Sequence, residues 1–247
     1  MRPVLVLAHR GASADAPENT LPAFLEAERQ GADGIELDAM LCGTGEVVVC
    51  HDERLERLAG LPWRVCQTPL WKLQQADVGS LLGFHPARIP TLEEVLATVS
   101  PRMVVNIELK CSELNDRGLS QSVVRLVQST GAAERVLISS FNAVCLWRVA
   151  EADPALRRGF LVDPDRAYFW QANVLAPLVS SYSVHLYHQA CTPDRVAAWK
   201  SRGRHIAAWT VDDPQTSLSL ERMGVAYCIT NRPRLIGERG RRRADAA

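Results

Sequence analysis

Short apolar segments alternate with longer amphipathic segments along the whole chain. The apolar segments are rich in Val and Ile and have the length of buried strands, whereas the amphipathic segments suit helices that bury one face. We predict eight strands, at residues 4–9, 34–41, 103–110, 136–141, 159–162, 183–186, 206–211 and 226–230. We predict helices at residues 20–30, 92–99, 119–129, 143–150, 193–201 and 215–223, and a less regular helical segment around 168–178.

Eight strands that alternate with helices over 247 residues predict an α/β fold, a (β/α)8 TIM barrel in which residues 1–247 form a single catalytic domain. One stretch interrupts the repeat, because residues 52–90 form a long insertion after the second strand. Connections of this kind lie over the carboxyl ends of barrel strands, where active sites are built. The insertion is therefore expected over the barrel mouth, either as part of the site or as a lid that only packs.

Composition narrows the function classes. Lys plus Arg and Asp plus Glu both number 28, so the net charge is zero and no nucleic-acid partner is indicated. The seven cysteines contain no C-x-x-C pair, which argues against a zinc site and a disulfide framework. No apolar run approaches 18 residues, and the first one is too short for a signal peptide, so no stable membrane insertion is expected. These features favour a cytoplasmic location and leave the oligomeric state open.

Acidic residues cluster at the ends of two predicted strands. Glu36 and Asp38 are two residues apart and therefore share one face, and Glu108 occupies a matching place on the next barrel strand. Three carboxylates at one barrel mouth would repel one another unless a cation were bound. Oxygen ligands without cysteine favour Mg²⁺ or Ca²⁺ over zinc. The alternative is a buried ion network of these acids with Arg10 and Lys110.

Two histidines lie at strand ends close to these acids. His9 ends the first strand, and His51 follows another apolar run at residues 46–50. Such a pair can supply the base and the acid that a displacement at phosphorus or at a carbonyl group requires. The aromatic residues Phe141 and Trp209 end two further strands, where they would either line a substrate pocket or close the top of the core.

Taken in order, these residues carry a family resemblance. The motifs are His9-Arg10-Gly11, Pro17-Glu18-Asn19-Thr20, Glu36-x-Asp38, His51-Asp52, Ile89-Pro90-Thr91-Leu92-Glu93-Glu94, Glu108-x-Lys110, Ser140-Phe141-Asn142 and Trp209-Thr210-Val211. Over nearly its whole length the chain resembles the glycerophosphodiester phosphodiesterase family. The resemblance implies a TIM barrel, a divalent cation, and hydrolysis of glycerophosphodiesters to sn-glycerol 3-phosphate and an alcohol.

The resemblance also implies roles for individual residues. It gives metal ligands at Glu36, Asp38 and Glu108, an acid/base pair at His9 and His51, phosphate-binding cations at Arg10 and Lys110, and substrate-loop residues at Glu18 and Asn19. Which histidine is the acid stays open. The nucleophile is either water or the glycerol hydroxyl of the substrate, and the resemblance favours the hydroxyl through a cyclic phosphate.

The chain departs from the family pattern at the end of its last strand. It has Asn231 in Thr230-Asn231-Arg232-Pro233, where the family often has an aspartate. Two rival functions remain: a lysophospholipid-acting phosphodiesterase of lysophospholipase D type on the same site, and a non-catalytic barrel that binds a phosphate ligand. The intact histidine pair and the three acids speak against the non-catalytic barrel. The preferred alcohol head group is not predicted.

Overall fold

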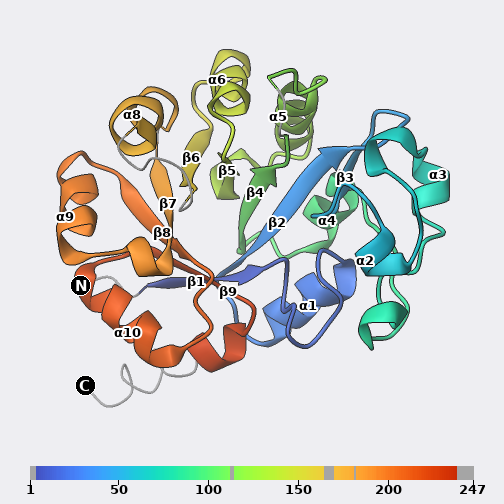
Figure 1. Cartoon of the computed structure of the whole chain (residues 1–247), viewed down its shortest axis with the longest axis horizontal. Coiled ribbons are helices and arrows are strands. Elements are labelled where there is room, and N and C mark those ends of the chain that lie inside the picture. The colour runs from blue at the N-terminus through green and yellow to red at the C-terminus, as the bar shows by residue number, and fades with distance from the viewer. Residues whose placement is uncertain (1–3, 112–113, 164–169, 181, 238–247) are drawn as a thin grey trace.

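The computed structural model describes residues 4–111, 114–163, 170–180 and 182–237. One sheet contains the described strands, in the order β1-β9-β8-β7-β6-β5-β4-β2-β3, and a further pairing of β1 with β2 closes a parallel barrel of eight strands (Figure 1). β3 lies outside the barrel and pairs antiparallel with β2. The strands are β1 (Leu5–His9), β2 (Gly34–Leu41), β3 (Val47–Val49), β4 (Val104–Leu109), β5 (Val136–Ser140), β6 (Arg157–Val162), β7 (Ser183–Tyr187), β8 (His205–Trp209) and β9 (Tyr227–Thr230).

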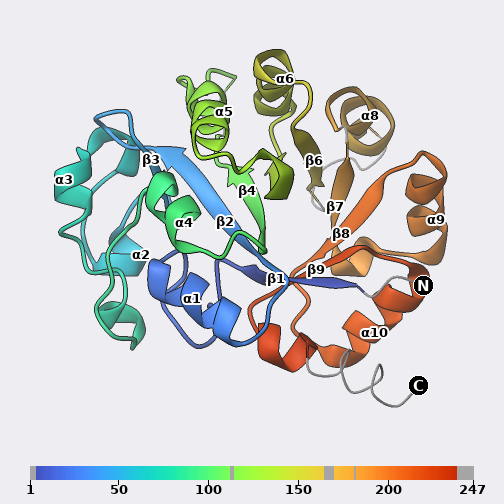
Figure 2. The same cartoon turned by 180° about the vertical axis from the view of Figure 1, so that it is seen from behind.

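Helices surround the barrel and run back from the end of one strand to the start of the next (Figures 1 and 2). They are α1 (Leu21–Arg29), α4 (Leu92–Thr98), α5 (Leu119–Ser129), α6 (Ala143–Ala152), α8 (Ala176–Val179), α9 (Pro193–Ser201) and α10 (Pro214–Met223). Outward-facing strand residues such as Ile35, Ile107 and Val184 pack against these helices in one large buried cluster. The arrangement confirms the predicted (β/α)8 barrel.

Local sequence explains where the helices begin. Thr91 caps α4 with a complete capping box, because its hydroxyl accepts from the Glu94 amide and the Glu94 carboxylate accepts from the Thr91 amide. Asn142 and Asp213 cap α6 and α10 more simply, because a side-chain oxygen of each accepts from a backbone amide in the first turn.

All eight predicted strands and all six regular predicted helices occur, with their ends shifted by at most two residues. The less regular segment predicted around 168–178 contains a π-helical turn, Gln171–Leu175, followed by α8. Residues 168 and 169 lie outside the described residues. In the described part of the chain, no helix combines the length and the apolar character needed to cross a bilayer.

The insertion after the second strand folds into short helices beside β3. It contains α2 (Glu56–Ala59) and α3 (Leu70–Leu73) with the 3₁₀ turns Val65–Gln67 and Ser80–Leu82. Its buried side chains form a small apolar cluster that includes Leu55, Leu73 and Ile89 and packs onto Met40 and Val48. Figures 1 and 2 both show α2 and α3 on the flank of the barrel, next to β2 and β3.

Candidate active site

A cavity of about 100 Å³ lies inside the barrel at the carboxyl ends of its strands. Most of the residues singled out in the sequence meet there, since its lining includes His9, Arg10, Glu36, His51, Glu108, Lys110, Phe141 and Trp209. The side chains of Asp38 and Glu18 contact Arg10 of this set, and the side chain of Asn19 in turn contacts Asp38. The structure therefore brings together all eleven candidate site residues.

The loop after β1 places Arg10 by an unusual backbone path. Arg10 and Gly11 both have positive φ angles, of 56° and 83°. A Cβ atom on Gly11 would lie 2.7 Å from the carbonyl carbon of Ala23 in α1, so only glycine permits this close approach. The Arg10 amide then donates to Glu36 Oε2 at 3.1 Å, and its Nη1 donates to Glu18 Oε1 at 2.9 Å. The turn thus orients the guanidinium group across the cavity.

Three carboxylates converge as expected. One oxygen from each of Glu36, Asp38 and Glu108 lies within 4.8 Å of the others. Burial and the neighbouring charge of Asp38 raise the pKa of Glu36 to about 8 and that of Glu108 to about 7. Such raised pKa values are expected when the buried carboxylates of a cation site lie close together without a cation.

The two basic residues do not neutralise this cluster fully. Lys110 Nζ lies 2.9 Å from Glu108 and 3.5 Å from Asp38, and Arg10 Nε lies 3.3 Å from Asp38. Although burial alone would raise the pKa of Asp38, these two cations lower it. Among the described residues, Glu36 has only His9 as an ion-pair partner, at 4.0 Å. The alternative ion network is thus present in part, but among the described residues no Lys or Arg side chain forms an ion pair with Glu36, and the three oxygen donors fit a divalent cation.

Asn19 holds the central acid in place. Its Nδ2 donates to Asp38 Oδ2 at 2.8 Å, and its Oδ1 accepts from the Asp38 amide at 3.2 Å. Asn19 also has a positive φ angle, of 57°, which asparagine tolerates better than most residues. The loop between β1 and α1 therefore fixes the carboxylate orientation as well as that of Arg10.

The two histidines have different partners at Nδ1. His9 Nδ1 lies 2.7 Å from Asn231 Oδ1, whereas His51 Nδ1 lies 2.7 Å from Asp52 Oδ1. Burial lowers the pKa of both rings, assisted at His9 by the charge of Arg10 and opposed at His51 by the charge of Asp38. Each Nδ1 atom is thereby engaged, which leaves Nε2 as the nitrogen that can reach a substrate.

Asn231 is oriented by a second carboxylate. Its Nδ2 donates to Asp212 Oδ2 at 2.6 Å, so its Oδ1 is turned toward His9 and can only accept. His9 must then carry its proton on Nδ1 and present an unprotonated Nε2. Asn231, where the chain departs from the family pattern, thus has a structural role at the site. The sequence did not reveal this role, because residues 9 and 231 lie at opposite ends of the chain.

The insertion contributes a residue that sequence analysis missed. Arg57 of α2 donates two hydrogen bonds to Glu18, at 2.8 and 2.9 Å, and one to Asp52 at 2.7 Å. Glu18 therefore lies between Arg57 and Arg10, and Asp52 lies between Arg57 and His51. No sequence signal links residues 18 and 57, because the contact depends on the fold of the insertion.

Aromatic residues line the exit from the cavity. Phe141 and Trp209 meet edge to face with 5.8 Å between ring centroids, and Tyr187 packs 5.6 Å from Trp209. Phe141 is 40% exposed, so it forms part of the rim and does not close the core. Beyond it runs an open groove of about 680 Å³, whose walls include Leu114, Trp170 and the rim of the cavity within the barrel.

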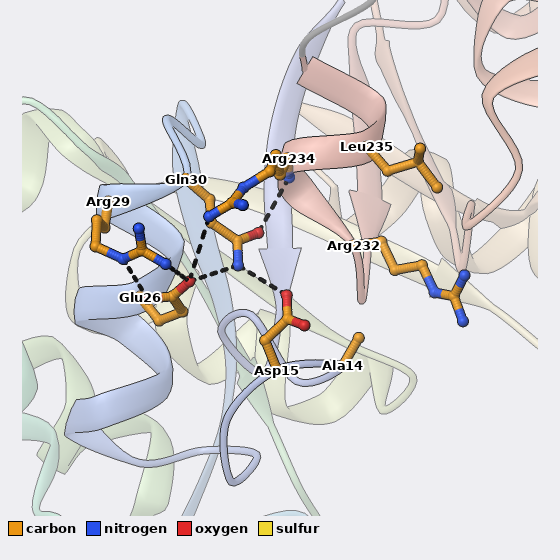
Figure 3. A pocket seen from close by; sticks show the side chains of 8 residues that line it. All are labelled: Ala14, Asp15, Glu26, Arg29, Gln30, Arg232, Arg234 and Leu235. Carbon is orange, nitrogen blue, oxygen red and sulfur yellow. Dashed lines mark hydrogen bonds and ion pairs between the residues drawn. The ribbon is translucent and has the colours of Figure 1, made fainter.

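A second hollow, of about 650 Å³, lies between α1 and residues 232–235 (Figure 3). Arg29 and Gln30 bond to Glu26 there, and Arg234 lies 3.9 Å from the same carboxylate. None of the candidate site residues lines this hollow. Because most of its charges pair with one another, we assign the chemistry to the cavity within the barrel.

Known proteins share this architecture and sequence pattern. The model of the Glycerophosphoryl diester phosphodiesterase family matches residues 9–235. A glycerophosphodiester phosphodiesterase of Caldanaerobacter subterraneus subsp. tengcongensis is 35% identical over 232 residues, covering 93% of this chain and 94% of the relative.

Solved structures agree with that match. An Oleispira antarctica phosphodiesterase, solved in complex with the product sn-glycerol-3-phosphate, superposes with a TM-score of 0.86 at 31% identity and 96% coverage of both chains. A glycerophosphodiester phosphodiesterase of Thermotoga maritima superposes with a TM-score of 0.78 at 28% identity, covering 96% of this chain and 99% of the other. The resemblance in the motifs is therefore confirmed: the chain belongs to the glycerophosphoryl diester phosphodiesterase family, and its enzyme class is that of the phosphodiesterases.

Proposed function

We propose that this protein hydrolyses glycerophosphodiesters to sn-glycerol 3-phosphate and an alcohol, with a divalent cation and a histidine acid/base pair. The observation that carries the proposal is the joint placement of two histidines, three carboxylates and two cations around one buried cavity. The product bound in the Oleispira antarctica relative supports the same reaction. A simple phosphate-binding protein would have no use for the histidine pair.

Glu36, Asp38 and Glu108 would hold the cation, Mg²⁺ or Ca²⁺, since their donors are all carboxylate oxygens. When bound there, the cation supplies Lewis-acid polarisation of the phosphodiester and offsets its negative charge. Arg10 and Lys110 add positive charge on the same side of the cavity. Both are fixed by acidic partners before substrate arrives, so they can stabilise the developing charge without reorganising.

The partners of the histidines assign their roles. His9 is held by the neutral amide of Asn231 with its proton on Nδ1, so its Nε2 can remove a proton from the nucleophile. His51 is held by the carboxylate of Asp52, which favours the protonated ring, so it can protonate the departing alcohol. His51 also lines the open groove as well as the cavity, which is where the alcohol would leave.

The groove beyond the cavity suits the alcohol of the substrate. Phe141 and Trp170 offer aromatic faces, and Glu53 and Asp163 add carboxylates to the same walls. Aromatic rings and acids together favour cationic head groups such as choline or ethanolamine. Glycerophosphocholine is therefore the first substrate to test.

The test is release of sn-glycerol 3-phosphate from glycerophosphocholine by purified protein that is metal-stripped, then supplied with Mg²⁺ or with Ca²⁺. We expect product only when a cation is present. Phosphorus NMR during turnover would separate the two nucleophiles, because attack by the glycerol hydroxyl passes through a cyclic phosphate and attack by water does not. Equal turnover in the stripped protein would refute the metal-dependent scheme.

A second candidate substrate is a lysophospholipid. Leu114 and Trp170 are exposed and line the groove. An acylglycerol arm could lie along this apolar wall if the substrate bound with its head group in the cavity. Release of choline from lysophosphatidylcholine at a higher kcat/KM than from glycerophosphocholine would establish this function.

We further propose a cytoplasmic enzyme of one domain. All seven cysteines are free thiols, which suits a reducing compartment. The apolar cluster of the insertion packs directly onto β2 and β3. Cell fractionation tests the location, and a single cooperative unfolding transition tests the domain assignment.

A further inference from the structure

Besides Arg10 Nε, which forms an ion pair with Asp38, three buried polar atoms around the active-site cavity have no hydrogen-bond partner among the described residues. They are Asn106 Oδ1 of β4, His185 Nδ1 of β7 and Trp209 Nε1 of β8, and all three residues line the same cavity. Asn106 and His185 are almost completely shielded from solvent. Because nearly all buried polar groups in folded proteins are hydrogen-bonded, three such atoms around one cavity mark a place that receives polar ligand atoms.

The barrel strands determine the surroundings of Asn106 and His185. Asn106 lies beside Glu36 in the β2–β4 register, so it adjoins the acidic cluster. His185 is next to Gly159 of β6, where a Cβ atom would lie 2.4 Å from the ring Nε2. That Nε2 lies 3.0 Å from Ser183 Oγ, which fixes the ring and leaves Nδ1 for another partner. The space therefore depends on a glycine facing the histidine.

The chemistry of the three atoms specifies the ligand. The Trp209 indole can only donate and the Asn106 carbonyl can only accept. Burial lowers the pKa of His185 to about 3, so the ring is neutral at physiological pH and adds no charge. Neutral donors and acceptors side by side match hydroxyl groups, which both donate and accept. A charged group would find no counter-charge among these three.

We propose that Asn106, His185 and Trp209 form a subsite for the hydroxyl groups of the substrate's glycerol arm and so determine which arm of the diester enters the cavity. The inference rests on the proposed function, because it assumes that the phosphate of a bound glycerophosphodiester lies between this subsite and the groove. At about 100 Å³ the cavity has room for a small polyol, whereas the groove of about 680 Å³ can hold alcohols of different sizes. An acyl chain on the glycerol arm would not fit the cavity.

Binding measurements test the subsite separately from catalysis. Isothermal titration of the full chain with Mg²⁺ or Ca²⁺ would compare sn-glycerol 3-phosphate with ethyl phosphate, which shares the phosphate but lacks the hydroxyl groups. We expect wild-type protein to prefer sn-glycerol 3-phosphate by about 10-fold or more, from two or three neutral hydrogen bonds. Asn106→Leu and Trp209→Phe should each weaken sn-glycerol 3-phosphate binding by about 3- to 10-fold and leave ethyl phosphate binding unchanged.

Stability controls exclude a merely structural effect. Asn106→Leu removes a buried atom that has no partner, so its Tm should equal or exceed that of the wild type. Ser120→Ala is the matched control, since it removes a buried hydroxyl bonded to the Cys145 carbonyl, away from the cavity. It should lower Tm without changing either affinity.

The outcomes separate this inference from the proposed function. Equal wild-type affinity for the two esters would overturn the glycerol subsite while leaving the phosphate site intact. The inference would also be overturned if Asn106→Leu and Trp209→Phe weakened the binding of both esters equally. Failure of the wild type to bind either ester would refute the proposed phosphodiesterase site itself, and the subsite with it.

Discussion

Asp52 holds the ring of its neighbour His51, with 2.7 Å between a carboxylate oxygen and Nδ1. Burial lowers the pKa of His51, and the charge of Asp38 and this contact with Asp52 offset part of that lowering. If His51 acts as the acid, it must be protonated in the active enzyme. In that case the contact with Asp52 extends activity to higher pH.

Asp52→Asn should move the alkaline limb of the kcat–pH profile to lower pH. Loss of the carboxylate lowers the pKa of His51, so the ring loses its proton earlier as pH rises. At pH 8 we expect kcat to fall by about 10-fold, in the range found when the partner that orients a functional histidine is removed. A profile with an unmoved alkaline limb would contradict the acid role of His51.

The two histidine roles predict different substrate dependence. His9→Ala should lower turnover of every phosphodiester by about 10²- to 10⁴-fold, because the base acts on the nucleophile. His51→Ala should do so for glycerophosphocholine but much less for a glycerophosphodiester of 4-nitrophenol, whose alcohol leaves without protonation. The ratio of the two rates in each variant is the measurement. Identical ratios in both variants would show that the assignment is wrong.

Cation binding should stabilise the protein more as pH rises. Glu36 and Glu108 have pKa values raised to about 8 and about 7, so the metal-free folded state holds protons that the unfolded chain releases above about pH 4.5. These two groups therefore stabilise the metal-free folded protein most at low pH, and their contribution is lost as pH rises toward 8. A cation replaces these protons and reverses that loss.

Thermal melts with and without Mg²⁺ or Ca²⁺, at about pH 5.5 and pH 8, measure how cation stabilisation depends on pH. The increase in Tm on adding cation should be larger at pH 8. Glu36→Gln should weaken the cation response, because one ligand loses its charge. A pH-independent increase in Tm in the wild type would indicate that the cation binds elsewhere.

The barrel itself follows from the sequence, because each strand is a short apolar run and each helix has an amphipathic face. The cluster of Glu36, Asp38 and Glu108 was predictable for the same reason, since period two and parallel strands place them at one mouth. The contacts of Asn231 with His9 and of Arg57 with Glu18 were not. They join segments far apart in the chain, and their geometry depends on loop paths that no periodicity encodes. His185 was not predicted as a site residue either, because a spacing of three on a strand argues against a metal pair with His188 and a histidine within an apolar strand resembles a core residue.

The insertion should affect the site through Arg57. Arg57→Ala removes the bonds to Glu18 and Asp52 and so loosens Arg10 and His51 indirectly. We expect kcat/KM to fall by about 10-fold. The stability loss should stay below about 1 kcal/mol, because the Arg57 side chain is 46% exposed and solvent screens its ion pairs. Arg54→Ala is the matched control, since the Arg54 side chain forms its ion pair with exposed Glu56 of the same insertion, and the substitution should leave kcat/KM unchanged.

Gly11 should tolerate a side chain poorly, for steric and for backbone reasons. A Cβ atom there would lie 2.6 to 2.8 Å from three atoms of Ala23, and the φ angle of 83° is itself unfavourable for alanine. Gly45 provides a matched comparison, because its φ angle of 96° is similar but nothing lies within 4 Å of its Cβ position. Gly45→Ala should therefore cost about 1–2 kcal/mol of unfolding free energy from the backbone alone. Gly11→Ala should cost more, because α1 must also move, and it should lower kcat by displacing Arg10. Urea titration and steady-state kinetics on both variants measure the difference, and equal costs would show that the loop after β1 can shift away from α1 without strain.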